Sequence, residues 1–217
     1  MSIFAQNVNC VLETAPTISI VSTETAKQYI KSDNDEVLED GLVEIFISGA
    51  VGKIEQELGG VALAQQTWKQ TQTGNCEYIK LLRQPIIEIS EIKYYETFDS
   101  AGEIIDSSNY RVIQPNKIIH KDGRFKGGRD KNAYEITFDC GLFTASNYTD
   151  INNNKLNALK TAILRTVSWM NEQRTEFQSG SMEGEWSTQY NQQILGRLLP
   201  IGIKHLIMPF HSGIGLI

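Results

Sequence analysis

The chain has 217 residues, 41% of them hydrophobic and 21% charged, so it can bury a core and is too apolar to be wholly disordered. Its formal net charge of −6 argues against a dedicated nucleic-acid clamp, because neutralising phosphates needs a surplus of Lys and Arg. Three distant cysteines form no C-x-x-C pair, and every apolar stretch is interrupted by polar residues, Gly or Pro. We therefore expect a soluble, reduced protein without a signal peptide or membrane span.

The first helix is predicted to follow a polar leader over residues 1–20. Ser22 is a suitable N-cap, and Val21 is placed to pack against Ala26 across the first turn. These signals predict a short helix over about residues 22–31.

A second, longer helix is predicted over about residues 35–58, ending at Gly59-Gly60. Its apolar face is predicted from residues that recur at three-to-four spacing: Leu38, Leu42, Ile45, Phe46, Ile54 and Leu58. Gly49 and Gly52 lie inside this helix, where each costs about 1 kcal/mol relative to Ala. They suggest a close approach of another backbone, such as that of a neighbouring copy.

Between about residues 65 and 140 the pattern changes to short runs of β-forming residues separated by turn residues. The segment from Phe98 to Gly102 is typical of a hairpin turn. This region predicts a small antiparallel sheet, and Trp68 within it is expected to belong to the core.

The third helix is predicted over about residues 155–173, with one apolar stripe from Leu156 to Met170 and Trp169 beside it, also expected in the core. We thus expect an α+β fold: a core domain over residues 21–174 and a glycine-rich arm over residues 175–217. The end of the arm is unusually apolar, through Leu198, Leu199, Ile201, Ile203, Leu206, Ile207, Met208, Phe210, Ile214, Leu216 and Ile217. Because Gly and Pro interrupt this segment, we expect no self-burying helix in it, and an assembly role for these side chains. The alternative is that the arm packs back on its own sheet.

Two charged segments are candidate contact surfaces. A basic loop contains Lys121, Arg124, Lys126, Arg129 and Lys131, and it suits either a phosphate backbone, an acidic neighbour or simply a solvated hairpin tip. An acidic segment contains Asp33, Asp35, Glu36, Glu39 and Asp40, which are also the residues expected in the first turn of any helix.

No motif for catalysis is present in the sequence. The three histidines stand in no nucleophile context, and G-x-S-x-G is absent. The loop from Gly123 to Asp130 has a G-x-x-x-x-G spacing but lacks the Lys and Ser/Thr of a phosphate-binding loop. We therefore expect no enzyme activity, no cofactor and no metal.

The order of the segments resembles the head–tail connector (adaptor) family of tailed bacteriophages. The resemblance covers roughly residues 20–175 and depends on these segments in succession: Ser22–Ile30, Asp33–Asp35, Ile54–Gly59, Gln66–Trp68, Leu82–Ile86, Ile92–Tyr95 with Gly102, Tyr110–Val112, Ile136–Gly141, Leu156–Ile163 and Asn171–Arg174. The polar leader and the long arm depart from the family pattern.

This resemblance implies a structural virion protein at the head–tail junction, assembled in the host cytoplasm. Many copies, usually twelve, would form a ring beneath the portal protein, extend the DNA channel and provide a platform for the next tail component. The five acidic candidates would then face the channel, past which genomic DNA moves without specific binding, and the apolar arm would dock on the portal or a neighbouring subunit.

Two other classes of function remain as alternatives. A DNA-binding accessory protein would use the basic loop and would bind free duplex in a salt-sensitive way. An enzyme would gain thermal stability from its metal or nucleotide.

Overall fold

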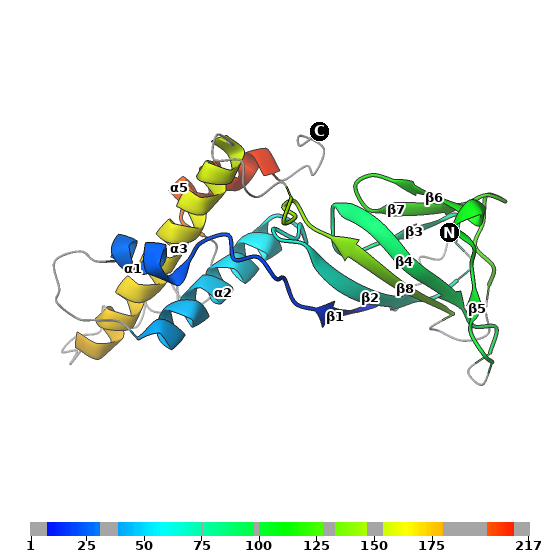
Figure 1. Cartoon of the computed structure of the whole chain (residues 1–217), viewed down its shortest axis with the longest axis horizontal. Helices are drawn as coiled ribbons and strands as arrows, with labels where there is room; N and C mark the ends of the chain where they lie inside the picture. The colour runs from blue at the N-terminus through cyan, green and yellow to red at the C-terminus, as the bar shows by residue number, and fades with distance from the viewer. Residues whose placement is uncertain are drawn as a thin grey trace, which may run out of the picture. The chain divides into compact units, whose positions relative to one another are not determined.

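The computed structural model describes residues 8–30, 39–74, 76–97, 100–127, 133–146, 154–179 and 199–210. They form two compact units (Figure 1). The sheet unit contains the described residues of 8–18 and 60–146, and the helical unit contains those of 19–59 and 154–210.

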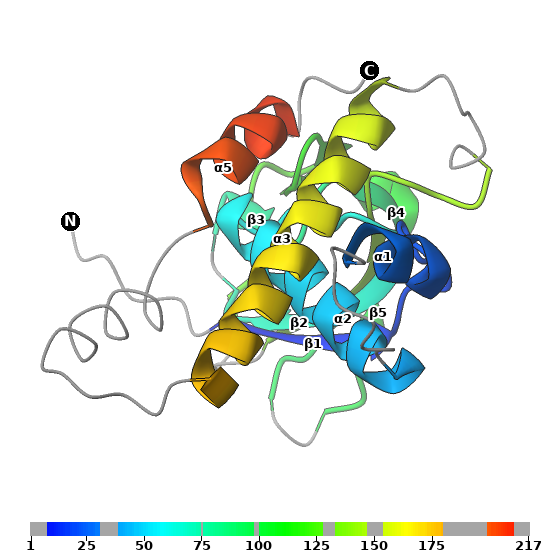
Figure 2. The ribbon, with the colours of Figure 1, turned by 90° about the vertical axis from the view of Figure 1, so that its left-hand side faces the viewer.

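The helical unit is built around one long helix. Its elements are α1 (Thr23–Ile30), α2 (Asp40–Glu57), α3 (Asn154–Ser179), α5 (Ile201–Ile207) and the single 3-10 turn η2 (Met208–Phe210). α3 contacts α1, α2 and α5, and Figure 2 shows α1 and α5 on opposite sides of it. The three helices expected from the sequence are therefore present, and α3 continues beyond residue 173 because no helix breaker occurs before Gly180.

The start of α1 follows the predicted capping pattern. The Oγ of Ser22 accepts a hydrogen bond from the backbone N–H of Thr25 at 3.2 Å. Val21 and Ala26 are both buried, as expected for residues that pack across the first turn of a helix. The N-cap is confirmed, and the burial of both residues agrees with the predicted contact between them.

The core of the helical unit lies between α2 and α3. On α3 the predicted stripe is confirmed, since Leu156, Leu159, Ile163 and Val167 are fully buried. On α2 the predicted face is partly wrong. The buried residues of its inner side are Val43, Ile47, Ala50 and Ile54, whereas Ile45 is 67% exposed. α2 is apolar on more than one side, so residue spacing alone fits two faces of it.

The sheet unit contains two antiparallel sheets, which confirms the predicted α+β fold class. The first sheet has the order β1 (Asn9–Thr14), β2 (Gln66–Gln72), β8 (Tyr134–Cys140), β4 (Ile86–Tyr94) and β5 (Glu103–Ile104). The second has the order β3 (Tyr78–Lys80), β7 (Lys117–His120) and β6 (Tyr110–Ile113), with the 3-10 turn η1 (Ser107–Asn109) before β6. β4 pairs with β5 antiparallel, as the predicted hairpin requires.

Strict alternation of side chains gives the sheet unit its core. Every second residue of β2 and of β8 is buried, so one face of the first sheet packs inward. Side chains from both sheets enter one hydrophobic cluster, among them Trp68, Ile92 and Phe138 from the first sheet and Ile79 and Ile118 from the second. Trp68 thus belongs to the core, as expected, while Trp169 of α3 is only half-buried.

The leader contains a strand that the sequence pattern did not indicate. β1 pairs antiparallel with β2 and forms one edge of the first sheet. Within β1 only Cys10 is partly covered, so its residues show no apolar–polar alternation. The description of residues 1–20 as a mere leader is therefore wrong for residues 9–14.

Candidate assembly surfaces

The apolar end of the chain is largely used by the chain itself. Leu199, Ile203, Ile207 and Phe210 are each no more than 4% exposed, and α5 contacts α3. The expectation that this segment forms no self-burying helix is therefore wrong. Pro200 immediately precedes α5 and Pro209 follows it, so neither proline interrupts the helix.

An ion pair also ties α5 to the end of α2. The Nζ of Lys204 lies 2.5 Å from Oε1 of Glu57. The Lys204 side chain is 32% exposed and the Glu57 side chain is 27% exposed. Partial cover reduces the screening of this pair by water. The pair and the four buried apolar residues together hold α5 within the helical unit.

Other residues of the predicted docking set remain available to a partner. Ile201 is 76% exposed and Met208 is 68% exposed, while Leu206 is half-buried. Leu198, Ile214, Leu216 and Ile217 lie outside the described residues. The structure thus divides the predicted set into side chains that stabilise the helical unit and side chains that face solvent.

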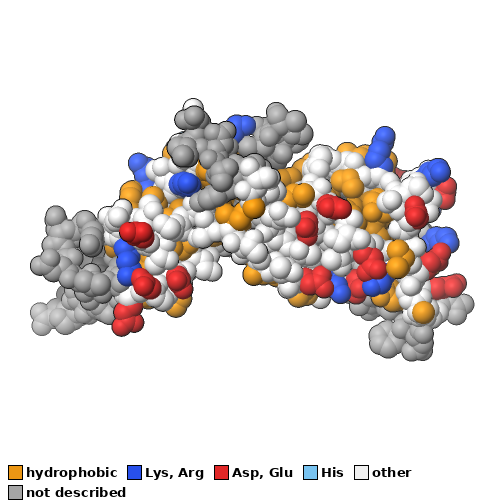
Figure 3. All heavy atoms as spheres, viewed as in Figure 1, with side chains coloured by type: hydrophobic (Ala, Val, Ile, Leu, Met, Phe, Trp, Pro, Cys, Tyr) orange, Lys and Arg blue, Asp and Glu red, His pale blue; other side chains and the backbone are white. Residues whose placement is uncertain are grey.

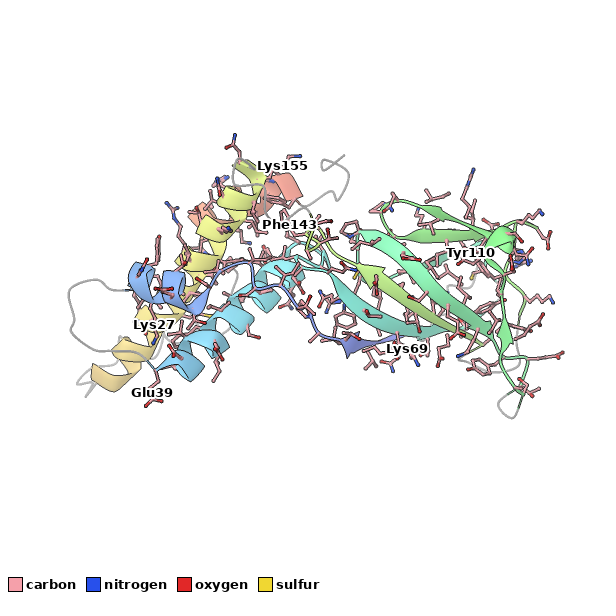
Figure 4. The ribbon with its side chains drawn as sticks, in the orientation of Figure 1. Lys27, Glu39, Lys69, Tyr110, Phe143 and Lys155 are labelled. Carbon is pink, nitrogen blue, oxygen red and sulfur yellow. The ribbon has the colours of Figure 1, made fainter. Side chains whose placement is uncertain are left out.

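The described part of the acidic segment lies at the start of α2. Glu39 occupies the N-cap position and is exposed, and Asp40 is the acidic residue of the first turn. Asp40 forms an ion pair with Lys27 of α1, and Lys27 and Glu39 are both labelled in Figure 4. Asp40 therefore has a structural role, favoured by the helix dipole, whereas the side chain of Glu39 forms no capping hydrogen bond. Asp33, Asp35 and Glu36 lie outside the described residues.

The basic loop is anchored rather than simply solvated. It connects β7 of one sheet with β8 of the other, so the interpretation as a hairpin tip is wrong. Phe125 in its middle is 1% exposed, its ring meets that of Tyr134 edge to face at 5.4 Å, and its N–H donates to the carbonyl of Cys76 at 2.9 Å. A buried aromatic residue among charged ones is a signal that the sequence does carry.

Three cations of the loop surround this anchor. Lys121, Arg124 and Lys126 are exposed, and the Nζ of Lys126 lies 5.9 Å from the centre of the Tyr94 ring. Asp122 lies among them, which lowers the net positive charge of the loop. Arg129 and Lys131 lie outside the described residues.

The outer face of the first sheet carries a ladder of charges that sequence reasoning did not single out. The Nζ of Lys69 in β2 lies 3.7 Å from the carboxylate of Glu13 in β1 and 3.5 Å from that of Glu135 in β8. The hydrogen bond from Lys93 to Glu91, in β4, raises the pKa of that lysine. Figure 3 shows acidic and basic side chains interleaved on the visible face of this unit, so these charges largely compensate one another.

No group of three or more His, Cys, Asp or Glu side chains within the described ranges is placed to hold a metal ion. Cys10, Cys76 and Cys140 form no disulfide bond, and burial raises the pKa values of Cys10 and Cys76. None of the described helices has the length and apolar character needed to cross a bilayer.

No protein-family model and no curated protein matches this chain. Its fold, in contrast, matches chains of gene transfer agent (GTA) particles. A chain in the neck of an empty GTA particle, with C6 symmetry, has a TM-score of 0.64 and 14% identity over 92% of this chain and 93% of that chain. A chain in the virion of a native GTA particle has a TM-score of 0.65 and 14% identity, covering 93% and 94% of the two chains.

A further match is to a chain in the neck of a native GTA particle with C12 symmetry. It has a TM-score of 0.55 and 13% identity, over 91% of this chain and 93% of that chain. The similarity therefore covers nearly the whole of this chain and of each neighbour. The fold predicted from the order of the sequence motifs is confirmed, and it is a fold found in particle necks.

Proposed function

We propose that this chain is a structural subunit of a virion-like particle, located in the neck at the head–tail junction. The observation that carries the proposal is the shared fold over more than nine-tenths of both chains with neck components. The family resemblance of the sequence motifs, obtained independently, implies the same location. Assembly would take place in the host cytoplasm.

Within the neck, the chain acts as a head–tail connector. Copies form a ring beneath the portal protein, extend the DNA channel and present a docking platform for the next tail component. The C6 and C12 symmetries of the similar neck structures support a ring, and twelve copies is the number that the family resemblance implies. The role requires no cofactor or catalytic group.

Sedimentation velocity and negative-stain imaging of the purified full-length protein test this function. A closed ring, alone or on the portal of its own particle, is the expected result. Immunogold labelling of particles from cells that encode the chain places it at the neck if the proposal holds. A protein that stays monomeric in both settings and is absent from purified particles contradicts it.

The acidic start of the helical unit is proposed to face the channel. Glu39 is exposed at the N-terminus of α2, and Asp33, Asp35, Glu36 and Asp40 are its neighbours in sequence. An acidic lumen repels the phosphate backbone and lets DNA pass without adhering. Replacing Glu39→Lys is expected to slow DNA release from assembled particles, whereas the matched Glu172→Lys change, at an exposed position of α3, leaves it unchanged.

The basic loop favours one alternative, a DNA-binding accessory protein. Lys121, Arg124 and Lys126 are exposed on an anchored loop, which is a suitable geometry for phosphate contacts. This alternative expects binding to free duplex DNA that weakens steeply with salt and that Lys126→Ala reduces. The connector proposal expects no measurable binding to free duplex at physiological salt.

A further inference from the structure

Asp40 and Glu44 are exposed at the start of α2, but beyond Glu44 the outward side of the helix carries no exposed charge. From Ile45 to the end of the helix, its exposed residues are Ile45, Ser48, Gly49, Gly52 and Gln56. The charged residues of the same stretch, Lys53, Glu55 and Glu57, are half-buried or buried. A helix face that meets only water normally carries charged side chains. We call the set of Gly41, Ile45, Ser48, Gly52 and Gln56 the α2 face.

Contacts within the chain do not account for this composition. Among the described residues, a Cβ atom added at Gly41 or Gly52 would meet no atom within 4 Å, so packing within this part of the chain requires neither glycine. Each lowers the intrinsic stability of the helix relative to Ala. Ile45 projects beside them with 67% of its surface exposed. The α2 face thus combines one apolar projection with two hollows where a second backbone fits closely.

A second uncharged face lies on α5 and η2. Its exposed residues are Ile201, Gly202, His205, Met208 and Pro209, which follow the spacing of one helix side. None of them is Lys, Arg, Asp or Glu. Ile201 and Met208 are more than two-thirds exposed. Among the described residues, a Cβ atom added at Gly202 would meet only Nη1 of Arg165, at 3.9 Å, so this exposed cation borders the face. We call this set the α5 face.

The two faces match each other in chemistry. Copies of a chain with net charge −6 repel one another, so a contact between copies is most favourable where both surfaces carry no charge. Charged residues are depleted and apolar residues enriched in the centres of protein interfaces. Each face offers apolar side chains and at least one glycine. Ile45 of one copy can therefore pack against Gly202 of a second copy, while Ile201 or Met208 of the second copy packs against Gly41 or Gly52 of the first.

We propose that the α2 face of one copy packs against the α5 face of a second copy. Because the two faces are different patches of the same helical unit, the contact is heterologous, and a pair of copies leaves one α5 face free on the first copy and one α2 face free on the second. Such contacts generate rings, which is the arrangement that the cyclic symmetries of the similar necks suggest. This inference rests on the proposed function and specifies which surfaces join neighbouring subunits.

Two single substitutions test the two faces separately. Ile45→Lys blocks the α2 face and Met208→Lys blocks the α5 face by placing a charge in an uncharged contact. Tyr29→Lys is the matched control, since Tyr29 is a 44% exposed apolar residue of α1 outside both faces. Because all three side chains are exposed, the melting temperature of each variant is expected to stay within about 2 °C of wild type. Self-association measured by sedimentation velocity should weaken about 30-fold or more for the first two variants only.

Mixing the two blocked variants gives the sharper test. The Ile45→Lys protein retains its α5 face and the Met208→Lys protein retains its α2 face. A heterologous contact therefore predicts that each variant alone is monomeric, while an equimolar mixture forms a one-to-one dimer and nothing larger. Light scattering after size-exclusion chromatography measures this mass directly.

The outcomes separate this inference from the proposed function. If wild-type protein forms rings and both variants do so equally well, the proposed contact is wrong while the connector function stands. If the variants are blocked but their mixture stays monomeric, the pairing of α2 with α5 is also wrong. If wild-type protein forms no ring, alone or on its portal, the proposed function itself fails.

Discussion

The side-chain Oε1 of Gln70 in β2 accepts a hydrogen bond from the backbone N–H of Leu82 at 2.8 Å. The Nε2 of the same amide donates to the carbonyl of Lys80, at the end of β3, at 2.9 Å. Gln70 is fully buried, so its amide replaces water for two backbone groups of the second sheet. One side chain thus links the two sheets of the sheet unit.

Replacing Gln70→Leu is expected to destabilise the protein by about 2–4 kcal/mol, because the Leu82 N–H and the Lys80 carbonyl lose the partner that the buried Gln70 amide provides. Chemical denaturation followed by circular dichroism measures the change. Thr71→Val is the control on the opposite, half-exposed side of the same strand, with an expected effect within about 0.5 kcal/mol. Equal effects of the two changes would contradict the linking role of Gln70.

Gly52 within α2 and Gly60 just after it are predicted to respond to Ala in opposite directions. Gly52→Ala is expected to raise the melting temperature of dilute protein by about 2–4 °C, since helix propensity improves by about 1 kcal/mol and the added Cβ meets no atom. Gly60→Ala is expected to lower it, because Gly60 has φ +89° and an added Cβ would overlap the carbonyl oxygen of Leu82. A stabilising Gly60→Ala change would show that the backbone differs there.

The sequence predicted those elements whose burial is periodic. The antiparallel sheet between about residues 65 and 140 was expected from its short β-forming runs, and the buried stripe of α3 follows from helical spacing. β1 was missed because an edge strand with nearly every residue exposed leaves no alternation to detect. Ile45 was assigned to the wrong side because α2 is apolar on two sides.

The candidate surfaces were harder to predict than the fold. Sequence reasoning counted Pro200, Gly202 and Pro209 as helix breakers, yet both prolines flank α5 and the glycine is tolerated because Ile203 and Ile207 are buried. Apolar composition alone also cannot separate Ile203, which is buried, from Ile201, which is exposed two residues earlier. That separation depends on where α5 packs on α3.

This separation of neighbouring isoleucines can be measured. Ile203→Ala should cost about 2–5 kcal/mol, because it removes buried methyl groups and leaves a cavity between α5 and the rest of the helical unit. Ile201→Ala should change stability by no more than about 0.5 kcal/mol. Thermal unfolding of both variants at one protein concentration tests the pair. An Ile203→Ala variant with the same melting temperature as the wild type would mean that α5 does not contribute to the core.

The last prediction concerns alkaline pH and begins with Cys10. Burial raises the pKa of the Cys10 thiol from 9.0 to about 11, and nearby Arg83 lowers it by a smaller amount. Burial also raises the pKa values of Cys76 and Tyr134. All three groups are acids whose neutral form the folded state favours. Between pH 9 and pH 11 the unfolded chain therefore binds fewer protons at Cys10 than the folded chain does.

It follows that the stability contributed by the neutral Cys10 thiol is fully present below pH 9 and is lost as the pH rises towards 11. We expect a lower melting temperature at about pH 10.5 than at about pH 8, with a smaller drop in the Cys10→Ala variant. In the folded protein below pH 9, a shift from 9.0 to about 11 also leaves about 100-fold less thiolate, so alkylation of Cys10 by iodoacetamide should be correspondingly slow. Rapid alkylation of Cys10 near neutral pH, measured by mass spectrometry, would contradict the partial burial of this thiol against the hydrophobic cluster of the sheet unit.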